Sequence, residues 1–170
     1  MNIYNFNNKF DYNKITLGNP QPIQGGSYFT KLKNGDDELY IQLPKCLTKQ
    51  GVCVTKKNKY TDLLYERSDE EKLIGWVEHL ESKCLELIDE KKSIWFHNDL
   101  SSDEISNMIT PICRMYKSGK KLLIRVLIEK NKYTNADKCV AYNEDETLVK
   151  LDELRNDQYV IPLICIEGIK

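Results

Sequence analysis

Short runs of strand-forming residues separated by turn signals constrain the fold of this chain most strongly. Gly18-Asn19-Pro20 closes one such run, and Asn34-Gly35-Asp36-Asp37 separates residues 27–32 from residues 39–43. Gly, Asn and Asp between two apolar runs are typical of β-hairpins. The pattern therefore predicts many short strands, with a hairpin between residues 27–32 and 39–43.

Two further hairpins and two single strands are expected along the rest of the chain. Each run is rich in β-branched, aromatic or aliphatic residues, and lysine-rich loops separate the runs of each hairpin. The expected strands are residues 51–55 and 60–65, residues 112–116 and 122–128, residues 138–142 and residues 159–166.

One long amphipathic segment interrupts this series of strands. Its apolar residues recur at helical spacing, at Leu73, Val77, Leu80, Cys84 and Leu87. Ser68 and Glu71 fit a capping box, in which each side chain accepts from the other residue's backbone N–H. The pattern predicts a helix over about residues 69–90. A second, short helix is expected from Ser101 to Met108, ended by Pro111.

The order of strands, one long helix and more strands predicts a β-rich α+β fold. An OB-like antiparallel barrel has five strands with a helix in the middle of the chain, and it suits this layout. Residues 1–11 are expected to form a flexible polar arm and residues 12–170 a single OB-like domain. Because the sequence ends directly after an apolar run, we expect this domain to be truncated at its C-terminus.

Composition excludes several classes of protein and leaves nucleic-acid binding open. The net charge of −1 argues against a uniformly basic surface, but a local basic groove is enough to bind nucleic acid. No apolar run approaches the roughly 20 residues of a membrane span. The six cysteines include no C-x-x-C pair, so they predict buried thiols and no zinc site. A polar N-terminus without an apolar signal segment favours the cytoplasm or the nucleus.

Catalytic motifs are absent from the sequence. It contains no phosphate-binding G-x-x-x-x-G-K-[ST] or G-x-G-x-x-G motif and no G-x-S-x-G nucleophile motif. The acidic residues near 99–104 are interpreted as helix-dipole partners, and those at 143–146 as a solvated turn. A Cys–His catalytic pair stays open as a minor alternative, since such residues need not be neighbours in sequence. We therefore expect that the chain is not an enzyme and that it binds no cofactor and no metal.

Cations alternate with aromatic residues in several of the expected strands. Proteins that bind single-stranded nucleic acid combine cations along the phosphates with flat side chains that stack on the bases. The candidate nucleic-acid-binding residues are Tyr28, Phe29, Lys31, Lys33, Lys45, Lys49, Tyr60, Arg114, Tyr116, Lys117, Lys120 and Arg125. The alternative is ordinary strand and surface chemistry, because tyrosine is common in strands and lysine at hairpin tips.

A set of motifs in fixed order adds a family resemblance. They are Thr16-Leu17-Gly18-Asn19-Pro20, Gly25-Gly26-Ser27-Tyr28, Tyr40-Ile41-Gln42-Leu43-Pro44-Lys45-Cys46, Thr48-Lys49-Gln50-Gly51, Tyr116-Lys117-Ser118-Gly119-Lys120 and Ile166-Glu167-Gly168-Ile169-Lys170. The set resembles a single-stranded-DNA-binding protein family of nucleocytoplasmic large DNA viruses. That family is similar to the OB-fold single-stranded-DNA-binding replication proteins of short-tailed phages.

The resemblance implies an OB fold with its long helix between barrel strands. It also implies sequence-tolerant binding of single-stranded DNA in viral DNA replication, recombination or repair, with viral replication proteins as partners. The expected location is the viral factory in the host cytoplasm or nucleus. The alternative is a virion structural or assembly protein that forms homo-oligomers or binds other proteins through its β-sheet surface.

Overall fold

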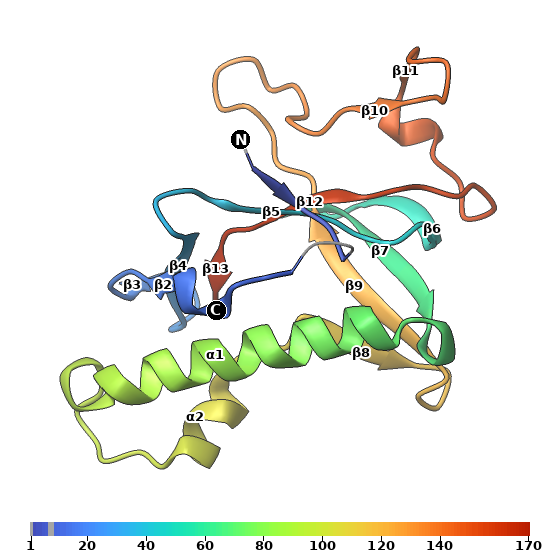
Figure 1. Ribbon diagram of the computed structural model, residues 1–170. Coiled ribbons are helices and arrows are strands. Elements are labelled where there is room, and N and C mark those ends of the chain that lie inside the picture. The colour runs from blue at the N-terminus through green and yellow to red at the C-terminus, as the bar shows by residue number, and fades with distance from the viewer. Residues whose placement is uncertain (1, 7–8) are drawn as a thin grey trace. The chain divides into compact units, whose positions relative to one another are not determined.

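The computed structural model describes residues 2–6 and 9–170 (Figure 1). The chain divides into two compact units of discontinuous sequence. Unit 1 consists of Met1–Leu43, Glu71–Pro111 and Leu163–Lys170, and unit 2 of Pro44–Glu70 and Ile112–Pro162. Two α-helices and several antiparallel sheets make the fold β-rich, as predicted. None of the sheets formed by the described residues closes on itself. The OB-like barrel, the helix inserted between its strands and the single domain over 12–170 therefore stay predictions.

Helix α1 (Glu71–Trp95) is the longest element of unit 1. It begins later than the predicted 69–90 because Arg67–Asp69 form a separate 3-10 turn, η2. It also extends five residues further, to Trp95. The capping role predicted for Ser68 is thus wrong, since Ser68 lies inside that turn. Helix α2 (Ser102–Met108) is confirmed, with the Ser101 hydroxyl accepting from the backbone N–H of Glu104 at 3.2 Å. No helix in residues 2–6 and 9–170 is long and apolar enough to cross a bilayer.

The strands of unit 1 form two small sheets. Strand β5 (Leu39–Gln42) pairs in parallel with β1 (Ile3–Tyr4) and antiparallel with β12 (Leu163–Ile166). Strand β4 pairs antiparallel with three short strands. The members of this second sheet are β4 (Tyr28–Asn34), β2 (Ile15–Leu17), β3 (Gln21–Pro22) and β13 (Gly168–Ile169).

The hairpin predicted between residues 27–32 and 39–43 does not form. Strands β4 and β5 lie in different sheets, and only the isolated bridge between Asn34 and Asp37 marks the expected turn. The reason is that β1 and β12 already occupy the two edges of β5. Turn chemistry identified the reversal of the chain correctly, but long-range pairing decided which strands became neighbours.

The N-terminal segment, expected to be a flexible polar arm, packs against helix α1 in its described part. The rings of Tyr4, Phe6 and Phe10 surround Trp76, with centroid distances of 6.1, 5.9 and 5.6 Å. Trp76 itself is buried. Residues 7 and 8 of the expected arm lie outside the described residues. Burial of aromatic area therefore ties this segment to unit 1, although most of its residues are polar.

Unit 2 is built on one antiparallel sheet with the strand order β6-β7-β9-β8. Its strands are β6 (Leu47–Val54), β7 (Lys59–Glu66), β8 (Cys113–Tyr116) and β9 (Lys121–Leu127). Both hairpins predicted in this part of the chain are confirmed, β6 with β7 and β8 with β9.

The C-terminal part of unit 2 contains shorter strands than expected. Strands β10 (Ala141–Tyr142) and β11 (Leu148–Val149) form a hairpin around residues 143–146, which confirms the predicted solvated turn. The strand predicted over 159–166 crosses the boundary between the units: Leu163–Ile166 form β12 of unit 1, and Val160 of unit 2 forms an isolated bridge with Cys46. A 3-10 turn, η3 (Leu151–Glu153), follows β11.

The two faces of the β6-β7-β9-β8 sheet differ in burial. Leu63, Tyr65, Leu122 and Ile124 project from one face and are buried. The Tyr65 hydroxyl donates to the backbone oxygen of Pro44 at 2.8 Å, so the buried phenol keeps a hydrogen bond. The other face carries charged and aromatic side chains, and it presents the candidate site.

Candidate nucleic-acid interface

The open face of this sheet gathers cations and tyrosines from four strands. Residues directly opposite each other in an antiparallel ladder share a face. Asp62 lies opposite Arg125, and Tyr60 lies opposite both Leu127 and Cys53. Arg114 and Tyr116 follow on β8, and Lys49 on β6. We call this set the cationic strip, and its members are Lys49, Tyr60, Asp62, Arg114, Tyr116 and Arg125.

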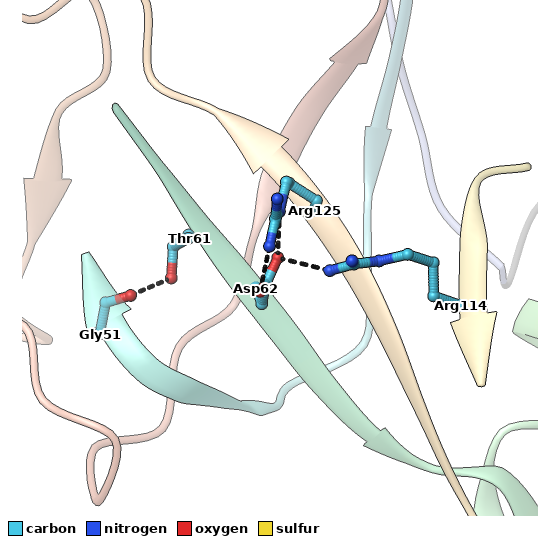
Figure 2. A network of polar contacts seen from close by, with 5 residues as sticks. All are labelled: Gly51, Thr61, Asp62, Arg114 and Arg125. Carbon is cyan, nitrogen blue, oxygen red and sulfur yellow. Dashed lines mark hydrogen bonds and ion pairs between the residues drawn. The ribbon is translucent and has the colours of Figure 1, made fainter. Parts of the chain in front are cut away.

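Asp62 is the centre of the cationic strip (Figure 2). Arg125 donates from Nε to Oδ1 at 2.9 Å and from Nη2 to Oδ2 at 3.0 Å. Arg114 reaches Oδ1 through Nη2 at the longer distance of 3.4 Å. The Asp62 side chain is only 2% exposed, whereas those of Arg114 and Arg125 are 46% and 43% exposed. The two guanidinium groups therefore cover the carboxylate and remain open to ligands on their outer sides.

The electrostatics of the cationic strip favour an anionic ligand. The hydrogen bonds from Arg125 hold the pKa of the Asp62 carboxyl below its ordinary value, and the charges of Arg125, Arg114 and Lys49 act in the same direction. The same bonds raise the pKa of Arg125. Three cations thus surround one ionised carboxylate, which leaves two positive charges on an open sheet face.

Each tyrosine of the cationic strip has a cation over its ring. The guanidinium carbon of Arg125 lies 3.9 Å from the ring centroid of Tyr60. Lys49 Nζ lies 4.9 Å from the centroid of Tyr116, and Lys117 Nζ from the adjacent turn lies 5.7 Å from it. Such cation–π contacts hold the side chains together and present flat groups beside positive charge.

Strand β6, which carries Lys49 of the cationic strip, contains a β-bulge. Between Thr48 and Val52 the register with β7 shifts, and Gly51 adopts a φ of 70°. The Gly51 N–H donates to Thr48 Oγ1 at 2.9 Å. The Gly51 carbonyl accepts from Thr61 Oγ1 at 2.7 Å (Figure 2). The bond from Thr61 ties the bulge to β7 one residue before Asp62, and the bond to Thr48 closes the bulge within β6.

The structure brings six of the twelve sequence-predicted residues together. Lys49, Tyr60, Arg114, Tyr116 and Arg125 belong to the cationic strip, and Lys117 contacts its edge. Two others lie elsewhere in unit 2. Lys120 is exposed in the β8–β9 turn, and Lys45 Nζ lies 5.2 Å from the ring centroid of Tyr159.

The remaining four predicted residues, Tyr28, Phe29, Lys31 and Lys33, lie on β4 of unit 1. Phe29, Lys31 and Lys33 alternate with the buried Thr30 and Leu32, as their spacing predicted. The Phe29 ring packs against Gly168 so closely that a Cβ at Gly168 would overlap it. Phe29 is therefore a packing residue with its ring partly covered, whereas Tyr28 is exposed.

Three residues of the open face were missed by sequence reasoning, namely Asp62, Leu127 and Cys53. Asp62 carried a usable signal, because a carboxylate inside the apolar strand Thr61-Asp62-Leu63-Leu64-Tyr65 needs a cationic partner if it is buried. Leu127 is 60% exposed beside Tyr60 and had no distinguishing signal. Cys53 is half-buried and lies opposite Tyr60.

Within residues 2–6 and 9–170, no cluster of three or more His, Cys, Asp or Glu side chains could hold a metal ion. No protein-family model, curated protein or solved structure matches the chain.

Proposed function

We propose that this chain binds single-stranded DNA with little sequence preference through the cationic strip. The observation that supports the proposal is the interleaving of Arg114, Arg125 and Lys49 with Tyr60 and Tyr116 on one open sheet face. As the sequence resemblance implies, the proposal places the protein in the DNA replication, recombination or repair of a large DNA virus. We also propose that the strands form an OB-like barrel. The proposed protein partners are viral replication proteins.

The mixture of groups favours a single strand over a duplex. Lysines and arginines bind phosphates of either form, since the backbone of both is anionic. Tyrosine rings and guanidinium planes add affinity only for bases that are unstacked, at about 1–3 kcal/mol per base. Leu127, exposed beside Tyr60, extends the surface on which a base is able to lie.

Titration of a labelled oligo-dT followed by fluorescence anisotropy tests the proposal, with a duplex of equal length as the control. Neutralising about four phosphates gives a salt slope near −0.7 per phosphate, so affinity should fall about 50-fold between about 50 and about 200 mM salt. Binding that is salt-sensitive and prefers the single strand supports the proposal. An absence of binding at the lower salt concentration contradicts it.

Exposed apolar residues favour a second candidate function, a virion structural or assembly protein. Tyr142 and Leu148 lie opposite each other in the β10–β11 hairpin, and both are exposed, as is Val140 just before it. Exposed apolar groups that lie together are typical of protein-binding surfaces. Sedimentation of the pure protein decides this point: a stable oligomer that Leu148→Ser dissociates, together with no DNA binding, would favour the assembly function.

A further inference from the structure

Arg125 is held in place more firmly than any other cation of the cationic strip. A carboxylate that accepts from Nε and Nη2 fixes the plane of the guanidinium, because both bonds lie in that plane. On Arg125 these bonds measure 2.9 and 3.0 Å, and the guanidinium carbon lies 3.9 Å from the ring centroid of Tyr60. Among the described residues, Lys49 and Arg114 of the strip and the adjacent Lys117 have single, longer contacts.

The presence of Asp62 requires an explanation if the strip binds DNA. A carboxylate cancels one positive charge beside the expected phosphates, and charge alone would therefore weaken binding. Burial of that carboxylate costs free energy unless hydrogen bonds offset it. The carboxylate of Asp62 is better explained if binding depends on the position of the Arg125 guanidinium than if it depends on the total positive charge.

We propose that Asp62 is a positioning residue that fixes Arg125 against Tyr60, and that this preformed unit holds one unpaired nucleobase of the bound strand. This inference rests on the proposed function and assigns a ligand to part of the same surface. The base stacks on the outer side of the Arg125 guanidinium, whose inner side covers the Tyr60 ring, and lies beside Leu127. Arg114, Lys49 and Lys117 bind the phosphates that follow.

The sign of the effect of Asp62→Asn on affinity tests the inference. The substitution adds one net positive charge and replaces the two acceptor oxygens that fix Arg125 with a single amide oxygen, so the paired bonds from Nε and Nη2 cannot both form. If Asp62 positions Arg125, the affinity for oligo-dT falls about tenfold, the scale of one lost base stack. If charge alone matters, the affinity rises. Glu66→Gln is the matched control, because Glu66 lies on the same strand, is exposed and pairs with Lys121 at 2.8 Å; its affinity should stay equal or rise.

An abasic strand separates positioning from a general structural effect. The probe is an oligomer of tetrahydrofuran phosphates, which has the backbone charge and no bases. Wild-type protein should bind it about tenfold more weakly per lost stack than oligo-dT. Asp62→Asn should bind the abasic strand as well as the wild type does, or more tightly, because no base is present to lose its contact. A loss of equal size on both strands would overturn the inference.

Arg125→Lys keeps the charge and removes the planar, two-bond geometry, so it serves if Asp62→Asn does not fold. It should weaken oligo-dT binding about tenfold and leave abasic binding unchanged. Wild-type protein that binds oligo-dT while both variants bind it equally well would overturn this inference and keep the proposed function. Wild-type protein that binds no single strand would overturn both.

Discussion

Arg125 and Asp62 face each other at directly paired positions of β9 and β7, joined by hydrogen bonds of 2.9 and 3.0 Å. Arg114 reaches the same carboxylate from β8 by one bond of 3.4 Å. Removal of Arg125 would leave a buried carboxylate without its main partner, whereas removal of Arg114 would not. The two arginines are therefore expected to differ in how far their loss affects folding.

Arg114→Gln should weaken DNA binding with little effect on stability. The variant removes one phosphate-binding cation, and it leaves Asp62 with both bonds from Arg125. We expect the affinity for oligo-dT to fall several-fold and the salt slope to shrink by about 0.7. Anisotropy titrations at several salt concentrations measure both quantities.

Lys132→Gln is the control for that experiment. Lys132 is exposed in the loop after β9, outside the cationic strip, and its substitution removes the same unit of charge. Its slope and affinity should stay close to those of the wild type. Equal losses in the two variants would mean that net charge, and not the strip, determines binding.

The lowered pKa of Asp62 predicts a specific dependence of stability on acid. The unfolded carboxyl has a pKa of about 3.9, and the folded one lies below its ordinary value because Arg125 donates to it. As pH falls below about 4, the unfolded state binds the proton first, so the free energy of unfolding decreases. Above that range the contribution is fully present.

Asp62→Asn should therefore cost about 2 kcal/mol near neutral pH and progressively less in acid. Urea unfolding at about pH 7 and at about pH 3 measures the free energy of unfolding of wild type and variant, and the difference between them should be smaller at the lower pH. Glu66→Gln should change stability little at neutral pH, because exposed ion pairs contribute about 0–1 kcal/mol. A wild-type–variant difference that is the same at both pH values would contradict the assignment of the acid effect to Asp62.

Gly51→Ala should destabilise the protein clearly. Gly51 has a φ of 70°, and a Cβ there would overlap the backbone oxygen of Leu154. We expect a loss of at least about 1–3 kcal/mol in urea unfolding. Gly75→Ala is the opposite control, because Gly75 is exposed in α1 with open space around its Cα, and it should gain up to about 1 kcal/mol. Equal effects at the two glycines would contradict the bulge geometry.

Tyr4→Ala should destabilise unit 1 and alter the emission of Trp76. The Tyr4 ring stacks on Trp76 and meets Phe10 edge-on at 4.7 Å, so its loss should cost about 1–2 kcal/mol. A Trp95→Phe background leaves Trp76 as the single tryptophan, whose emission should shift to the red as water reaches it. Ile3→Ala, the exposed neighbour, should do neither. Unchanged emission in Tyr4→Ala would contradict the packing of the N-terminal segment.

Local patterns predicted the hairpins of unit 2 because their information is local. Thr55 and Asn58 close the β6–β7 turn through bonds between residues three apart, and Lys117 and Lys120 do the same in the β8–β9 turn. Both turns join strands that are neighbours in sequence and in the sheet. The periodicity of α1 was equally local, although its start was misplaced by the 3-10 turn at Arg67–Asp69.

Long-range pairing was not predictable from these patterns. Strand β5 pairs with β12, more than a hundred residues later in the chain, and no turn signal encodes that choice. In the candidate site, too, local patterns were predictable and long-range contacts were not. Alternation correctly placed Arg114 and Tyr116 on one face, but the burial of Asp62 depends on arginines from two other strands. A single sequence gives no measure of such pairings.

Cys53 offers a direct probe of where the strand binds. It is half-buried and lies opposite Tyr60, beside the unit that we assign to a base. Bound oligo-dT should slow alkylation of Cys53 by a maleimide several-fold, because the strand would cover the thiol. The exposed Cys139 of unit 2 is the internal control, and its rate should stay unchanged. Peptide mass spectrometry measures both rates in one sample. Protection of Cys139 with none at Cys53 would locate DNA binding away from the cationic strip, and equal protection of both would indicate a general change in the protein.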